Sequence, residues 1–133
     1  MLDGKSVLVI GVGPGLGKEI ARVAHRDGAA VFMAARRADN LRAAADELDP
    51  SGERVGYLAT DITDSVQLDA LVAATVERFG KLDGLAICAS NDSGMGGLES
   101  TSEKAWRATF EVNVFATANA VRAALPALKV QGG

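Results

Sequence analysis

Closely spaced glycines near the N-terminus form the pattern with the clearest chemistry. Residues 10–17 read IGVGPGLG and follow an apolar run, residues 7–10, which is typical of a buried strand. The helix expected next would bury an apolar face made of Leu16, Ile20, Val23 and Ala24. A strand, a glycine turn and a helix in this order predict an anion site at the helix N-terminus, typically for the pyrophosphate of a nucleotide. The alternative is a turn whose glycines serve only positive φ and close packing.

The spacing of these glycines distinguishes between the known nucleotide-binding patterns. The common dinucleotide pattern G-x-G-x-x-G fails from either start, because Leu16 and Lys18 stand where glycine is needed. The phosphate-binding pattern G-x-x-x-x-G-K-[ST] fails because Glu19 follows the Gly-Lys pair. The pattern that fits is G-x-x-x-G-x-G, on Gly11, Gly15 and Gly17.

This spacing resembles that of the short-chain dehydrogenase/reductase family, whose members bind NAD or NADP on a Rossmann-like sheet. The resemblance implies a tight turn at the first glycine, close approach of the backbone to phosphate at the second, and close helix–sheet packing at the third. The turn residues implied to bind the cofactor are Gly11, Gly13, Pro14, Gly15, Leu16 and Gly17. Nucleoside-diphosphate-sugar epimerases, another family on this fold, usually have G-x-x-G-x-x-G, which the spacing does not match.

Strand and helix patterns alternate along the chain, with strands expected at residues 7–10, 30–34, 55–58 and 85–89. Each strand is apolar throughout, which predicts an α/β fold with a parallel sheet and helices on both faces. Right-handed crossovers give a Rossmann-like strand order 3-2-1-4, in one domain over residues 1–133. Asp64 and Gln67 predict a capping box at the start of the third helix, and the last helix is expected from residue 101 towards Pro126.

Two arginines follow the second expected strand, where the adenosine ribose of a bound dinucleotide would lie. NAD sites place a carboxylate there, but this chain has Arg36 and Arg37, with no acid before Asp39. A guanidinium can form two parallel hydrogen bonds with a 2′-phosphate. The pair therefore favours NADP over NAD, unless both arginines are solvated loop charges.

Further site residues are implied by the family resemblance. Asp61 matches the acid that accepts a hydrogen bond from the adenine amino group, with Ile62 beside it, and helix capping is the alternative for Asp61. The family's Asn-Asn-Ala-Gly reads Ile-Cys-Ala-Ser here, and Ala89 and Ser90 are expected at the cofactor. Asn113 matches the helix asparagine that supports a water chain to the catalytic lysine. We expect Asn113 to be buried, the alternative being an ordinary position on the helix surface.

The family's remaining catalytic residues have no counterpart in these 133 residues. In the family a tyrosine of a Tyr-x-x-x-Lys motif donates the proton to the carbonyl oxygen, with a serine upstream. The only tyrosine here, Tyr57, is followed four residues later by Asp61. We therefore expect the cofactor-binding part of an enzyme that moves hydride between NADP(H) and a carbonyl or alcohol, truncated before the later strands and inactive alone. The alternative is a nucleotide-binding or interaction module without chemistry of its own.

Composition argues against several other classes of protein. A net charge of −3 with scattered basic residues, and 5% aromatic residues, argue against a nucleic-acid partner. No apolar stretch approaches the ~18 residues of a membrane span, and no metal site is expected. The only cysteine, Cys88, fits a reducing cytoplasm and is expected as inert packing within the fourth strand. The only histidine, His25, is expected on the surface. Oligomeric state is left open, with a homo-oligomer as one outcome.

Overall fold

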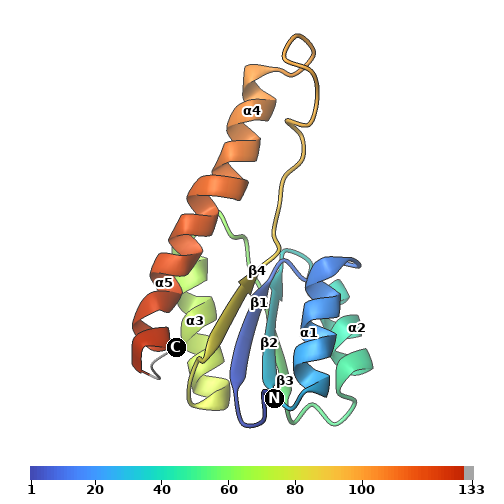
Figure 1. Ribbon diagram of the computed structural model, residues 1–133, viewed down its shortest axis with the longest axis vertical. Coiled ribbons are helices and arrows are strands. Elements are labelled where there is room, and N and C mark those ends of the chain that lie inside the picture. Colours follow the sequence, from blue (N-terminus) through green and yellow to red (C-terminus); the bar gives the residue numbers. More distant parts are fainter. Residues whose placement is uncertain (131–133) are drawn as a thin grey trace.

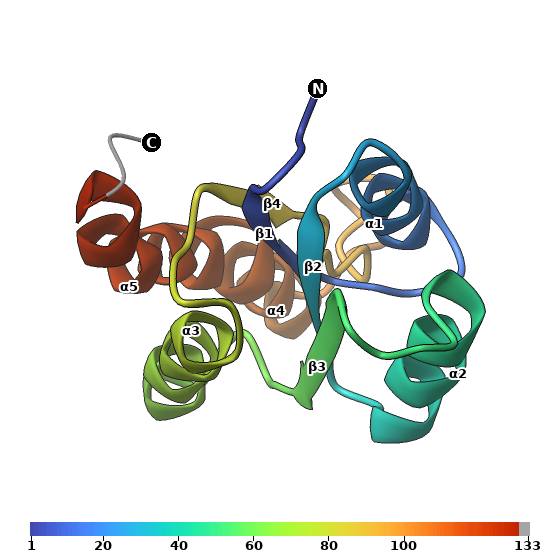
Figure 2. The same ribbon diagram turned by 90° about the horizontal axis from the view of Figure 1, so that it is seen from below.

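The computed structural model describes residues 1–130 and shows a parallel sheet between two layers of helices (Figures 1 and 2). The strands are β1 (Ser6–Ile10), β2 (Ala30–Ala35), β3 (Val55–Ala59) and β4 (Gly84–Ile87). They are ordered β3-β2-β1-β4, and all pairings are parallel, as the sequence predicts. Because the strands are parallel, their carboxyl ends share one edge of the sheet.

Helices cover both faces of the sheet (Figure 2). They are α1 (Leu16–Arg26), α2 (Ala38–Leu48), α3 (Ser65–Phe79), α4 (Glu103–Phe110), the π-helical segment η1 (Glu111–Ala116) and α5 (Thr117–Val130). Side chains alternate along a strand, so Leu8 and Ile10 of β1 pack towards α3 and α5 while Val9 packs towards α1 and α2. The central strands β1 and β2 are therefore buried on both faces, which explains their apolar sequences, whereas the edge strand β3 is exposed over Tyr57–Ala59.

The buried face of α1 differs from the expected one. Small residues form it, namely Gly17, Ala21 and Ala24, whereas Leu16 is 70% exposed and Val23 is also exposed. The prediction of Leu16 and Val23 as buried positions is wrong. Since α1 starts directly against the glycine turn, only small side chains fit between this helix and the sheet.

Asp64 caps α3, as predicted, but the expected capping box is altered. The Asp64 carboxylate accepts hydrogen bonds from the N–H groups of Val66 and Gln67. The Gln67 carboxamide oxygen accepts from the N–H of Asp61 at 2.9 Å instead of from the N–H of Asp64, and its Nε2 donates to the Asp64 carboxylate at 3.0 Å. The box therefore also fixes the backbone of Asp61, three residues before the cap.

Strand β4 is shorter than expected and ends at Ile87. The N–H of Cys88 still donates to the Ile10 carbonyl, at 2.7 Å, and the chain then turns away over Gly11. Cys88 is therefore not inside a strand, and its half-buried side chain lies at the carboxyl end of the sheet. Burial raises the pKa of the Cys88 thiol.

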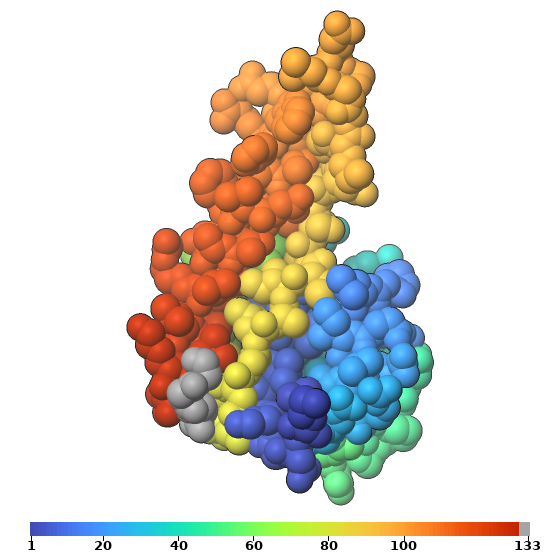
Figure 3. Space-filling view, viewed as in Figure 1, coloured from blue at the N-terminus to red at the C-terminus, as the bar shows by residue number. Residues whose placement is uncertain are grey.

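The last helical segments join into one long helix that extends past the sheet (Figures 1 and 3). Ser102 caps its start by accepting from the N–H of Ala105, close to the predicted beginning. The helix continues through Pro126 as far as Val130, beyond the expected end. No helix within residues 1–130 is long and apolar enough to cross a membrane.

His25 is not the surface residue expected from the sequence. Its side chain is only 14% exposed, and Nε2 lies 3.8 Å from a carboxylate oxygen of Asp49. The guanidinium of Arg54 donates to the carbonyl of His25 at 3.1 Å. Burial, and then the charge of Arg54, lower the pKa of His25. This cluster lies at the end of the sheet opposite the glycine turn.

Candidate functional site

A cleft of about 490 Å³ lies at the carboxyl edge of the sheet, between the segments that follow the four strands. Eight of the residues predicted to bind a cofactor line it: Gly11, Gly13, Arg36, Arg37, Asp61, Ile62, Ala89 and Ser90. The other four, Pro14, Gly15, Leu16 and Gly17, lie beside it at the start of α1 and do not line it. The fold thus brings together residues that are up to about 80 positions apart, as expected at a topological switch point.

The glycine turn has the local geometry that its spacing predicts. Gly11 has φ +96°, and a Cβ there would lie 2.2 Å from the backbone nitrogen of Ala89. A Cβ on Gly17 would lie 2.2 Å from the carbonyl oxygen of Gly11. At Gly13 and Gly15, in contrast, a Cβ would have no neighbouring atom within 4 Å. The outer glycines therefore allow close packing within the protein, and the inner two leave the backbone open to a ligand.

The N-terminus of α1 has no side-chain cap. Gly15 occupies the cap position, and no side chain among residues 1–130 caps the helix there. Helix N-termini carry unpaired N–H donors and the positive end of the helix dipole. A phosphate group beside Gly15 would satisfy these donors.

Arg36 and Arg37 form the β2 side of the cleft. Both are exposed, and neither takes part in an ion pair within residues 1–130. Asn40, in the first turn of α2, lines the same corner. The corner thus offers two guanidinium groups and one amide, which suits an anionic group with several acceptor oxygens.

Asp61 lies at the β3 side of the cleft and is fixed by its neighbours. Its Oδ1 accepts from the backbone N–H of Thr63 at 2.9 Å and from the Thr63 hydroxyl at 2.7 Å. These two bonds, followed by the charge of Arg36, outweigh partial burial and hold the pKa of Asp61 below its usual value. The carboxylate is therefore charged at neutral pH and acts as an acceptor, while Asp64 does the helix capping.

Asn113 does not occupy the expected environment. Its side chain is exposed and does not line the cleft, so the expectation of a buried residue is wrong. Both polar atoms of its amide are nevertheless hydrogen-bonded to Asn91: Oδ1 accepts the Asn91 N–H at 2.8 Å, and Nδ2 donates to the Asn91 carbonyl at 2.9 Å. Asn113 thus supports the segment that forms the β4 side of the cleft.

Several lining residues were missed by sequence reasoning. They are Ile10, Val12, Ala35, Asn40, Thr60, Thr63, Cys88, Asn91 and Val112. Thr60 and Thr63 flank Asp61, and Asn40 lies four residues after Arg36, so proximity in sequence could have suggested these three. Val112 comes from the long helix, and only the tertiary structure brings it here. Within residues 1–130 no group of three or more His, Cys, Asp or Glu could hold a metal ion.

A sequence profile described as short chain dehydrogenase matches residues 5–133. The chain belongs to this family. It is 33% identical over 131 residues to the glycine betaine reductase ATRR of Emericella nidulans, covering 98% of this chain and 10% of that protein. It is 30% identical to an A-factor type gamma-butyrolactone 1′-reductase of Streptomyces virginiae, covering 99% of this chain and 51% of that protein.

The solved structures agree with this assignment. A crystal structure of an actinorhodin polyketide ketoreductase variant with NADPH matches with a TM-score of 0.88 and 30% identity, over 99% of this chain and 51% of that one. The Rossmann-like fold predicted from the sequence is thereby confirmed. The chain thus has the fold of an oxidoreductase family that binds NAD or NADP, and it spans about half the length of this ketoreductase.

Proposed function

We propose that this short-chain dehydrogenase binds NADP(H) in the cleft and serves hydride transfer between that cofactor and a carbonyl or alcohol. The observation that carries the proposal is the pair of exposed arginines at the end of β2, without an ion-pair partner among the described residues. A carboxylate at this corner would repel a 2′-phosphate, and Asp39 is the nearest acid in the sequence that follows. Two cations here favour the phosphorylated cofactor.

The residues of the cleft fit the parts of a dinucleotide in order. The open backbone at Gly13 and Gly15, with the uncapped start of α1, would take the pyrophosphate. Arg36 would hold the 2′-phosphate, and the charged Asp61 would accept from the adenine amino group. Bound there, NADPH supplies the hydride, while the protein holds and orients it.

Two comparisons support the choice of cofactor and chemistry. The similar polyketide ketoreductase was crystallised with NADPH, and the similar Streptomyces protein is named as a reductase. This chain covers about half of each of these proteins. The substrate of the whole protein is therefore proposed only as a class, a carbonyl or an alcohol. The 133 residues contain no Tyr-x-x-x-Lys motif.

The proposal is tested by comparing NADPH and NADH binding with and without the arginine. Arg36→Gln removes the charge and keeps an amide donor on a shorter side chain. Because a charged hydrogen bond contributes about 1.5–3 kcal/mol, we expect NADPH affinity to fall roughly ten- to a hundredfold while NADH affinity changes less than about threefold. Quenching of Trp106 fluorescence or isothermal titration calorimetry would measure both constants.

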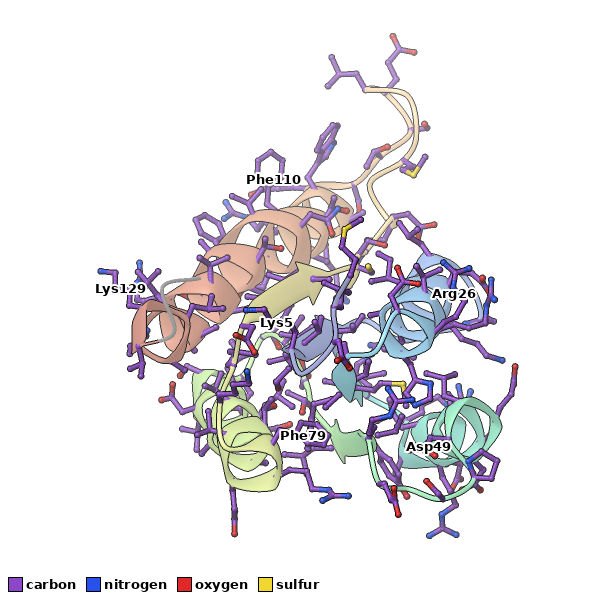
Figure 4. All side chains as sticks on the ribbon, turned by 60° about the horizontal axis from the view of Figure 1, so that its bottom comes forward. Lys5, Arg26, Asp49, Phe79, Phe110 and Lys129 are labelled. Atoms are coloured by element: carbon purple, nitrogen blue, oxygen red, sulfur yellow. The ribbon has the colours of Figure 1, made fainter. Side chains whose placement is uncertain are left out.

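Arg26→Gln is the matched control for this experiment. Arg26 ends α1 and lies at the far end of that helix from the cleft, where it pairs with Asp27 (Figure 4). We expect this variant to bind both cofactors like the unmodified chain. Tighter binding of NADH than of NADPH by the unmodified chain would contradict the proposed role of Arg36.

A further inference from the structure

The β4 side of the cleft is a glycine-rich segment whose position depends on hydrogen bonds to the long helix. Beyond Ser90 the chain runs alongside the long helix (Figure 1). Asn91 is held through both its backbone groups by the side chain of Asn113. The Asn91 carboxamide oxygen then accepts from the N–H and the hydroxyl of Ser93, at 2.9 and 2.6 Å. This turn directs the next residues onto the helix.

Thr109 provides the next attachment of this segment. Its Oγ1 accepts the N–H of Gly94 at 2.8 Å. The Ser93 hydroxyl oxygen also lies 3.4 Å from the carbonyl oxygen of Ala105 and 3.5 Å from the Thr109 hydroxyl. Ala105, Thr109 and Asn113 follow one another at intervals of four residues, so they lie along one side of the helix. All three contact residues within 91–94, and Thr109 and Asn113 hydrogen-bond to them.

Gly94 and Thr109 are fitted to each other. Gly94 is buried, and a Cβ there would lie 2.7 Å from Oγ1 and 3.3 Å from Cβ of Thr109. A larger residue at position 94 would separate the segment from the helix. Without the threonine hydroxyl, the buried N–H of Gly94 would lose the acceptor it has in this structure, which is costly.

We propose that Thr109 is a positioning residue of the cofactor cleft, acting through Gly94 and Ser93 on Asn91 and Ser90 at its edge. Thr109 does not line the cleft, and its side chain contacts the segment that does. Residues 94–97 include three glycines, and ordering such a chain at the moment of binding would cost conformational entropy. Fixing it beforehand preserves affinity. The inference rests on the proposed function, because it concerns binding of NADPH.

Substitutions of Thr109 in the 133-residue chain test this role. Thr109→Val keeps the shape and removes the acceptor, whereas Thr109→Ser keeps the hydroxyl. We expect Thr109→Val to raise the NADPH dissociation constant about three- to tenfold and to accelerate hydrogen exchange at the Gly94 amide about tenfold or more. Thr109→Ser should restore both to within about twofold. The control is Thr75→Val, which removes a hydroxyl bonded to the Leu71 carbonyl inside α3 and should change neither quantity.

The outcomes separate this inference from the proposed function. Faster exchange at Gly94 together with weaker NADPH binding, both reversed by serine, supports the positioning role. Faster exchange with unchanged NADPH affinity overturns it, since the contact would then be structural only. Unchanged exchange at Gly94 overturns the contact itself. A third outcome is that the unmodified chain binds no NADPH while Thr109→Val still accelerates exchange at Gly94. The proposed function then fails, and the positioning role for that cofactor fails with it. The hydrogen bond between Thr109 and Gly94 is nevertheless supported.

Discussion

Two glycines at the ends of the turn are required by contacts inside the protein. Gly11 lies under the backbone of Ala89, and Gly17 lies against the carbonyl of Gly11. Neither neighbour is a flexible side chain that could move aside. The sequence spacing predicted a tight turn and close helix–sheet packing at these positions, and the structure confirms both.

Gly17→Ala should therefore destabilise the fold. The added methyl would meet the Gly11 carbonyl oxygen at 2.2 Å, so α1 must shift away from the sheet. Overpacking of this kind costs about 1–3 kcal/mol of unfolding free energy, which urea denaturation followed by circular dichroism would measure.

Gly13→Ala is the matched control, four residues earlier. A methyl at Gly13 would have open space, and the φ of Gly13 is not positive. We expect a change of less than about 0.5 kcal/mol in unfolding free energy. Equal destabilisation by the two substitutions would contradict the packing role assigned to Gly17.

At the scale of elements, the π-helical segment η1 interrupts the long helix where it passes the cleft. Residues Glu111–Ala116 form it, and it includes both Asn113 and the cleft-lining Val112. Such segments are rare and frequently occur at functional sites. Asn113 was expected to be buried because it follows Trp106 and Phe110 at helical spacing, but both of these residues are themselves exposed.

The end of α2 carries a pH-dependent contact. The hydroxyl of Ser51, followed by the N–H of Arg54, donates to the Asp49 carboxylate and lowers its pKa to about 2. The ordinary value is 3.8, so the unfolded chain takes up this proton more readily than the folded one. The contact stabilises the fold above about pH 4, and its contribution is lost as the pH falls through about 2.

Asp49→Asn should therefore make the unfolding free energy depend less on pH in acid. The variant is expected to be less stable than the unmodified chain at neutral pH and to lose less stability between about pH 4 and pH 2. Urea denaturation at a series of pH values would show this. Asp69→Asn is the control, because Asp69 is exposed on α3 and has no side-chain hydrogen bond within residues 1–130. If unfolding free energy depends on pH in the same way for Asp49→Asn and for the unmodified chain, the prediction is contradicted.

At the scale of the whole molecule, the sheet is covered on both faces but the long helix is not. Large apolar residues are exposed along it, and Figure 4 shows Phe110 pointing away from the sheet. They are Trp106, Phe110, Val114, Phe115, Val121, Leu125 and Val130. Monomeric proteins seldom leave large apolar patches uncovered.

We expect the 133-residue chain to bind NADPH without oxidising alcohols or reducing carbonyls. Hydride transfer to a carbonyl requires a proton donor at the oxygen, and the only tyrosine, Tyr57, lies in β3 and is 37% exposed, outside the cleft. Absorbance of NADPH in the presence of a panel of ketones and aldehydes would measure turnover. Enzyme-dependent consumption of NADPH by purified chain would show that another group donates the proton.

The sequence by itself determined the strands, the glycine turn and the arginine pair, because these depend on local apolar runs and on residues that directly follow a strand. The strand order followed from these elements because crossovers between parallel strands are right-handed. It misplaced the buried face of α1, since the limiting distance between Gly17 and Gly11 is a tertiary contact. Only the tertiary structure brought Thr109 to Gly94 and Asn113 to Asn91, which are 15 and 22 residues apart. Those contacts depend on where β4 ends and on the π-helical turn at Glu111–Ala116. The spacing of apolar side chains in the sequence reveals neither feature.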